Sequence, residues 1–240
     1  MAYISPYIIF NGTSSEDLGF VVEKLPDEHR AKRNIEETQI PGRPGRLITD
    51  LGSYDIYQTK LTLNCFGHPI GDVNAWLQGE GWLTTSEDPE HMRWVAFYDQ
   101  FTDSRFRCDG LCYDSVTIPL RAWPYKHLAV QEPIVRTEPD VFRGMGNANA
   151  SPVIEVTGSG NINLMVNDAT VLIDGLDGAI TIDCDARTAY REVGGVRSFA
   201  GRMVTLADDD DWPELKPEVN LLNWSGDVRE VRITPWWRWL

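Results

Sequence analysis

The amino-acid sequence alternates between apolar and polar residues with a period of two in many short segments. The clearest case places Tyr57, Thr59, Leu61, Leu63 and Cys65 on one side, with polar residues between them. Successive side chains of a β-strand point to opposite faces, so this pattern predicts a strand with one buried face. The same alternation recurs in both halves of the chain, at residues 162–166, 180–184 and 231–233.

Turn residues agree with a chain built from short strands. Asp-Gly pairs favour tight hairpin turns because glycine tolerates positive φ. Many short strands separated by such turns are typical of a sandwich or a barrel. The pairs are Asp109-Gly110, Asp174-Gly175 and Asp177-Gly178.

Only one segment, residues 70–78, has the period of a helix. Ile70, Val73, Trp76 and Leu77 recur at the spacing of one helix face, and Gly79 follows as a stop signal. We therefore predict a mainly β fold with one short helix, in which each half of the chain forms a β-sandwich or a barrel-like domain.

The chain is long enough for two domains. Its 240 residues exceed the common single-domain size of about 100–150 residues. Between Pro133 and Pro152, Gly, Asn, Ala and Pro gather without periodicity, as they do in a linker between domains. We expect an N-terminal β domain at residues 1–137 and a C-terminal β-sandwich at residues 138–240.

Charge and hydropathy exclude two classes of protein. The formal net charge is −14, and so acidic a surface repels nucleic acid, which disfavours specific nucleic-acid binding. No run approaches the roughly 20 apolar residues that span a bilayer, and the opening residues lack the basic and apolar segments of a signal peptide. We expect no membrane association and synthesis in the cytoplasm.

No catalytic or metal-binding motif stands out. The four Cys and four His residues are scattered without ligand spacing, and the four acids at residues 208–211 lack the frame of a calcium loop. Thirty-six acidic residues leave a glycoside hydrolase with a carboxylate pair as the enzyme alternative, but no pair is singled out. We predict no catalytic role, no cofactor and no metal.

The tryptophan content leaves a carbohydrate-binding module as a second functional alternative. Nine tryptophans are present, and three of them close the chain as PWWRWL. Alternation predicts that Trp237 and Trp239 pack inward while Trp236 is exposed. An exposed tryptophan suits a subunit interface, where aromatic residues are enriched, or the sugar-stacking surface of a carbohydrate-binding module.

Several segments, in order, resemble the distal tail proteins of bacteriophages. Each motif alone is a Gly/Pro turn of modest specificity, but together they cover nearly the whole chain. The segments are FNGTSSEDLGFVVEKL from residue 10, IPGRPGRL from residue 40, LTTSEDPEHMRWVAFYD from residue 83, VTIPLRAWPYKH from residue 116, GNANASPVIEVTGSG from residue 146, IDGLDGAITIDCDARTAY from residue 173 and WPELKPEVNLLNWSG from residue 212.

This resemblance implies a structural virion protein at the distal end of a phage tail, assembled in the host cytoplasm. The family forms a homohexameric ring whose N-terminal domains surround a channel for DNA and whose C-terminal domains are galectin-like β-sandwiches. The ring joins the tail tube protein to the tail-tip hub or baseplate and is a platform for receptor-binding proteins. In some relatives the last strand returns to the N-terminal domain, here after about residue 231.

We expect the Gly/Pro-constrained loop to take part in this ring, because it carries two cations in an otherwise acidic chain. Closed rings need head-to-tail contacts between two different surfaces of each subunit. The candidate interface residues are Ile40, Pro41, Gly42, Arg43, Pro44, Gly45, Arg46 and Leu47.

Overall fold

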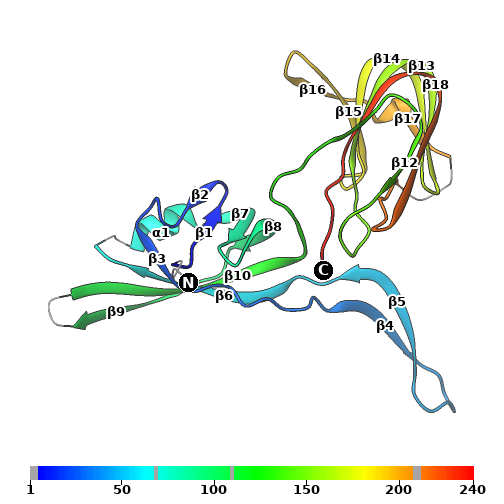
Figure 1. Cartoon of the computed structure of the whole chain (residues 1–240). Helices are drawn as coiled ribbons and strands as arrows, with labels where there is room; N and C mark the ends of the chain where they lie inside the picture. The colour runs from blue at the N-terminus through cyan, green and yellow to red at the C-terminus, as the bar shows by residue number, and fades with distance from the viewer. Residues whose placement is uncertain (1–4, 68–69, 109–110, 208–211) are drawn as a thin grey trace. The chain divides into compact units, whose positions relative to one another are not determined.

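The computed structural model describes residues 5–67, 70–108, 111–207 and 212–240. The chain folds as two compact units, the first made of Met1–Ala129 together with Leu240 and the second of Val130–Trp239. Each unit has its own antiparallel sheet, and the described residues contain one α-helix (Figure 1). The predicted mainly β fold with one short helix is confirmed. No helix in these residues is long and apolar enough to cross a membrane.

The sheet of the first unit runs in the order β2-β1-β7-β8-β10-β6-β3. Its longest strand, β10, pairs with β6 along one edge and with β9 and then β8 along the other. The strands are β1 (Ile8–Phe10), β2 (Thr13–Ser14), β3 (Phe20–Lys24), β6 (Tyr57–Cys65), β7 (Gly79–Thr85), β8 (Asp88–Phe97), β9 (Thr102–Cys108) and β10 (Leu111–Leu128).

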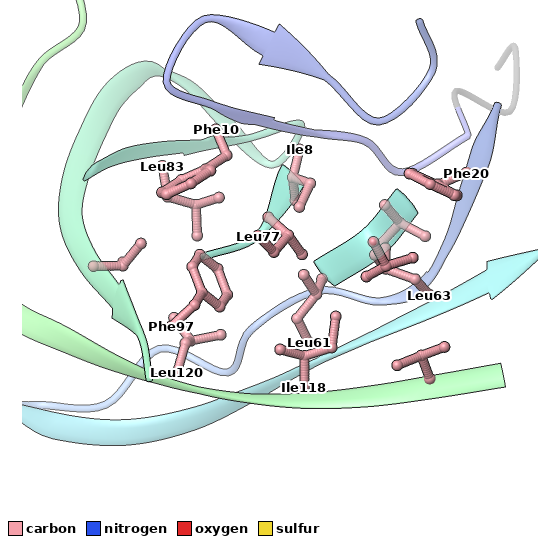
Figure 2. Packing of buried hydrophobic residues seen from close by; sticks show 14 of the residues in the cluster. Ile8, Phe10, Phe20, Leu61, Leu63, Leu77, Leu83, Phe97, Ile118 and Leu120 are labelled. Carbon is pink, nitrogen blue, oxygen red and sulfur yellow. The ribbon is translucent and has the colours of Figure 1, made fainter. Parts of the chain in front are cut away.

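The core of the first unit lies between this curled sheet and the helix α1 (Ile70–Trp76). Figure 2 shows Leu61 and Ile118, from β6 and β10, pointing toward Leu77 at the end of the helix. All three residues are buried. The predicted helix thus forms, with Val73 completely buried on its inner face, and the predicted strand at residues 57–65 is β6 with its alternate residues buried.

The sheet of the second unit runs in the order β11-β18-β13-β14-β15-β16. Strands β13, β14 and β18 are long, and β13 pairs with both of the others. The strands are β11 (Ile134–Arg136), β12 (Asp140–Arg143), β13 (Val153–Val166), β14 (Ala169–Asp183), β15 (Thr188–Val193), β16 (Val196–Phe199), β17 (Val204–Leu206) and β18 (Val219–Thr234), with the short 3-10 helix η1 (Gly201–Met203).

The segment that the composition suggested as a linker contributes to this second sheet. Strands β11 and β12 both pair with β18. The alternating residues predicted to be buried near the end of the chain, Val231 and Ile233, lie on β18 and are completely buried.

Two of the predicted hairpin turns are wrong. Asp174-Gly175 and Asp177-Gly178 lie inside the continuous strand β14, and the register between β13 and β14 shifts near them. Gly175 and Gly178 still have positive φ, so the residues have the backbone freedom of a turn but form a bend that lets the strand curl. The third pair, Asp109-Gly110, lies outside the described residues.

Candidate functional site

A two-stranded hairpin extends from the first unit (Figure 1). It consists of β4 (Arg33–Gln39) and β5 (Arg46–Tyr54), which pair only with each other in the described structure. We call residues 33–54 the arm. No residue of the arm is buried, so neither of its faces packs on a core of the described chain.

The loop singled out in the sequence forms the tip of the arm. Gln39 pairs with Arg46, and the six residues between them reverse the chain. The Arg43 N–H donates to the Ile40 carbonyl at 3.2 Å, which closes a β-turn over Pro41 and Gly42. Gly42 has a φ of 78°, as the third position of a type II turn requires. The structure therefore brings all eight candidate residues, 40–47, together at one exposed tip.

Ion pairs between the strands stiffen the arm. Arg33 on β4 pairs with Asp50 on β5 at 2.5 Å, and Arg46 pairs with Glu37 at 2.6 Å. The hydrogen bonds from Arg33 and from the Gly52 N–H lower the pKa of Asp50. Arg46 is thus already engaged within the arm, whereas the exposed Arg43 side chain has no ion pair among the described residues.

Large apolar side chains on the arm are exposed to solvent. The exposed fractions are 41% for Ile35, 49% for Leu47, 61% for Ile48 and 58% for Leu51. A two-stranded hairpin alone is marginally stable in water, and exposed apolar groups on such an element mark an interaction surface. The arm is therefore suited to pack against another protein surface.

A polar network holds the segment that leads into the arm. Asp88, the first residue of β8, accepts hydrogen bonds from Lys126 on β10 and from His91, both at 2.7 Å. Lys126 also pairs with Glu28 in the segment between β3 and β4. Next to Glu28, the His29 ring lies 5.6 Å from the Tyr57 ring. Together these contacts fasten the base of the arm to the sheet.

The same network lines a pocket of about 300 Å³ in the first unit. Thr59 is buried there, and its hydroxyl has no hydrogen-bond partner in the described part of the chain. Arg93 lies with its guanidinium 5.3 Å from the centre of the Tyr57 ring, and burial lowers its pKa. The arrangement is one of ion pairs and ring contacts around a small polar cavity.

Acidification is expected to loosen this network. Burial tends to raise the pKa of Asp88, but the hydrogen bonds from Lys126 and His91 outweigh it and the pKa is lowered. A carboxyl group whose pKa falls on folding stabilises the folded state above its unfolded pKa of about 3.9. That stability is lost as the pH falls through the folded pKa. Carboxyl-carbon NMR should give a pKa of Asp88 below 3.9.

Removal of the Lys126 ammonium should reverse this shift. Lys126→Met is expected to raise the pKa of Asp88. The variant loses the Lys126 hydrogen bond that lowers this pKa, while burial still raises it. Lys60→Met, on the exposed side of β6, is the matched control and should leave it unchanged. Equal pKa values in the wild type and Lys126→Met would contradict the network.

The displaced pKa values of carboxyl groups in the described residues share one direction. A glycosidase general acid needs a raised pKa, whereas the described carboxyl groups with displaced pKa values all have them lowered. These are Asp27, Asp50, Asp88, Asp114 and Asp140.

The two cysteines whose side chains the structure describes, Cys65 and Cys184, are both buried. Burial raises the pKa of the Cys65 thiol to about 11, and it also raises that of Cys184. Thiols with raised pKa values are poor nucleophiles at neutral pH. Within the described ranges, no three or more His, Cys, Asp and Glu side chains gather as metal ligands.

Trp236, the candidate exposed aromatic residue, lies in the second unit just after β18. Its side chain is half-buried, and its backbone φ is 49°. The neighbouring Trp237 is buried and Trp239 is half-buried. Trp236 is therefore in a different unit from the tip residues 40–47, and these two predicted sites are separate features of the chain.

Sequence reasoning missed a second pocket, of about 520 Å³, in the second unit. Four segments that are far apart in the sequence line it: residues 149–151, 166–169, 184–187 and 212–216, together with Arg238. None of them carries a recognisable motif. The one visible signal was the solitary Trp212, which lies in a polar stretch away from the alternating strands.

Comparison with known proteins gives a likeness of fold. No protein-family model and no curated protein matches the sequence. The Dit (gp 19.1) protein of phage SPP1, described as a paradigm of the hub adsorption apparatus in phages infecting Gram-positive bacteria, superposes with a TM-score of 0.69 at 15% identity, over 99% of this chain and 100% of that one. A chain of the phage P2 baseplate in its activated conformation with calcium gives 0.49 at 10% identity, over 96% and 98%.

Proposed function

We propose that this chain is a structural subunit of a phage tail, a distal tail protein located at the end of the tail in the virion. Two independent observations support it. The ordered segments of the sequence resemble that family, and the fold is similar to that of SPP1 Dit over the full length of both chains. The proposed role is an adaptor without catalytic activity.

The proposed assembly is a homohexameric ring. The exposed arm is the observation that carries this proposal, because its apolar residues Leu47, Ile48 and Leu51 cover nothing in the described structure. A ring closes through heterologous contacts, in which one surface of a subunit meets a different surface of the next. In the proposed ring, each arm packs on the first unit of the neighbouring subunit.

The ring would join the tail tube protein to the tail-tip hub and present the second unit as a platform for receptor-binding proteins. Six copies carry a formal charge of 6 × −14 = −84. Acidic groups around a channel repel DNA phosphates, so DNA would pass without binding. A positive electrostatic potential along the bore of the assembled ring would contradict this part of the proposal.

Mass measurement and imaging test the ring. A hexamer has a mass of 6 × 27.2 = 163 kDa, and light scattering of the purified protein should detect this species. Negative-stain images should show rings with a central hole. A 27.2 kDa species at every concentration, with no rings alone or with tail tube protein, would exclude the proposal.

Charge reversal at the tip of the arm is expected to weaken assembly. Arg43→Glu tests the contact between subunits more specifically, because Arg43 makes no ion pair in the described chain. Arg46→Glu would also break the pair with Glu37 within the arm. We expect at least a tenfold rise in the concentration at which half of the protein is assembled, or about 1.4 kcal/mol per subunit contact. Sedimentation velocity measures it.

Two further variants complete this test. Lys60→Glu, which reverses a charge on an exposed residue of β6 outside the arm, is the matched control and should assemble normally. The double variant Arg43→Glu with Arg46→Glu should be the weakest of all. Normal assembly of the double variant would show that the tip is merely solvated.

A further inference from the structure

The second unit contains a polar pocket that the proposed ring does not use. Ser151 and Val166 flank the two ends of β13, and Ala169 and Cys184 flank those of β14, yet all four residues border the same pocket. The sheet therefore curls until both ends of the β13–β14 hairpin approach each other. The volume of about 520 Å³ lies within the range of about 300–1,000 Å³ for ligand pockets.

Buried hydrogen bonds fix the loops around this pocket. Asn220 is completely buried. Its side-chain oxygen accepts from the Lys216 N–H at 2.7 Å and from the Asn167 amide at 2.9 Å. Its amide donates to the Lys216 carbonyl at 2.9 Å. The Asn167 amide also donates to the Glu214 carbonyl at 2.7 Å. Two of the four loops are thereby locked to each other before any ligand arrives.

Side-chain pairs tie the remaining loops together. Lys216 pairs with Asp168 at 2.6 Å, and Arg238 pairs with Asp185 at 2.7 Å. The Asn149 amide donates to the Glu214 carboxylate at 2.9 Å, and the backbones of residues 150 and 215 exchange two hydrogen bonds of 2.8 Å. The pocket is thus preorganised, which reduces the entropy lost when a ligand binds.

Several groups at the pocket are available to a ligand. Trp212 is half-buried and is one of the residues that line the pocket. Arg187 is exposed at the rim with a φ of 52°, and its guanidinium makes no hydrogen bond within the described ranges. A non-glycine residue in this left-handed conformation is strained, and such strain concentrates at functional sites. The Ser151 hydroxyl and the second oxygen of Asp185 likewise have no hydrogen-bond partner among the residues that the structure describes.

Among the described residues that line the pocket, acidic and basic side chains are equal in number. Asp168, Asp185 and Glu214 contribute three negative charges, and the positive charges come from Arg187, Lys216 and Arg238. A phosphate group or a polyanion would meet as many carboxylates as cations, in a protein with a net charge of −14. Sugar hydroxyls both donate and accept hydrogen bonds, so they can engage carboxylate and guanidinium groups together. An aromatic wall with such polar groups matches the apolar face and the hydroxyl edge of a pyranose.

We propose that this pocket binds a neutral hexose unit of a glycan, with Trp212 against the sugar ring and Arg187, Asp185 and Ser151 bonding to its hydroxyl groups. This inference does not rest on the ring, because every residue involved lies in one unit of a single chain. For a protein at a tail end, such a site would give direct contact with a surface polysaccharide.

Saturation-transfer NMR on the full chain tests the site. The probes are the methyl glycosides of glucose, galactose, mannose and N-acetylglucosamine, with glycerol phosphate as the anionic comparison. We expect transfer to the ring protons of at least one glycoside and a weaker signal from glycerol phosphate. Transfer to none of the four, or stronger binding of glycerol phosphate, would overturn the proposal.

Two variants separate sugar binding from folding. Trp212→Ala should weaken binding about tenfold through loss of ring stacking, while Trp224→Ala, on β18 outside the pocket, should bind normally. Arg187→Gly removes the guanidinium but relieves the left-handed strain, so it should fold at least as well as the wild type and bind more weakly. Unchanged affinity in both pocket variants would place the sugar elsewhere. Light scattering of the same variants reports assembly separately, and it should be unaffected.

Discussion

Removal of the arm is expected to convert the proposed hexamer into a well-folded monomer. The variant replaces residues 33–54 with a two-residue Gly-Gly turn between Lys32 and Asp55. These flanking residues already approach each other, because the Asp55 N–H donates to the Lys32 carbonyl at 2.8 Å. Paired residues in antiparallel strands lie about 5.5 Å apart, and a two-residue turn spans such a gap.

The fold should survive this deletion, because the arm contributes nothing to the core. The apolar cluster of the first unit contains no residue between 32 and 56. The partly buried apolar residues that pack against this cluster likewise include none between Leu25 and Tyr57. We therefore expect the same circular dichroism spectrum and a melting temperature within a few degrees of the wild type, together with complete loss of rings.

The proposed interface also predicts that the exposed apolar side chains of the arm are needed for assembly. Ile48→Ser with Leu51→Ser, which keeps the backbone of the arm but removes two exposed apolar side chains, should also abolish rings. Val130→Ser, which changes an even more exposed apolar residue outside the arm, is the control and should assemble. Rings formed by the deletion variant would show that the arm is not the contact.

The second large effect is expected for Asn220→Ala, which should strongly destabilise the second unit. The side chain is completely buried and makes three hydrogen bonds, two to the backbone of Lys216 and one to Asn167. Truncation leaves these partners without their bonds, at about 1–3 kcal/mol for each buried group that water cannot reach. We expect a loss of about 2–4 kcal/mol, measured by denaturant unfolding.

Asn223→Ala is the matched control for this substitution. Asn223 lies on the same strand, β18, but is exposed, and within the described residues its side chain bonds only to the neighbouring Trp224 N–H. Its loss should change the free energy of unfolding by less than about 0.5 kcal/mol. Equal effects of the two substitutions would show that the buried network is not what holds the loops around residues 167 and 216. Asn220→Ala should also weaken sugar binding, because those loops form the pocket.

The local spacing of apolar residues was sufficient to predict the strand β6 and the helix α1. Strand β6 begins and ends where its alternation does, at Tyr57 and Cys65. Helix α1 begins at Ile70 as predicted and ends at Trp76, two residues before the predicted end at residue 78. Both predictions succeed because one face of each element is buried against a single core, so the hydrophobic period records the packing directly.

The arm shows where the pattern stops being informative. Leu47, Ile48 and Leu51 follow no clean alternation, because neither face of the arm is buried in the chain itself. The sequence still indicated the tip, through the Gly/Pro turn and its two arginines. It could not indicate that the flanking residues form a projecting hairpin, since no core of the described chain buries either face of the arm.

By itself the sequence determined the class of fold, the strands and helix with one buried face, and the turn at the tip of the arm, because these depend on residues close together along the chain. Only the tertiary structure decided that the Asp-Gly pairs at residues 174–178 bend a strand instead of ending it. It alone brought residues 149–151, 166–169, 184–187 and 212–216 around one pocket. The physical reason is that a curled sheet joins distant segments through long-range pairing, which no local period encodes.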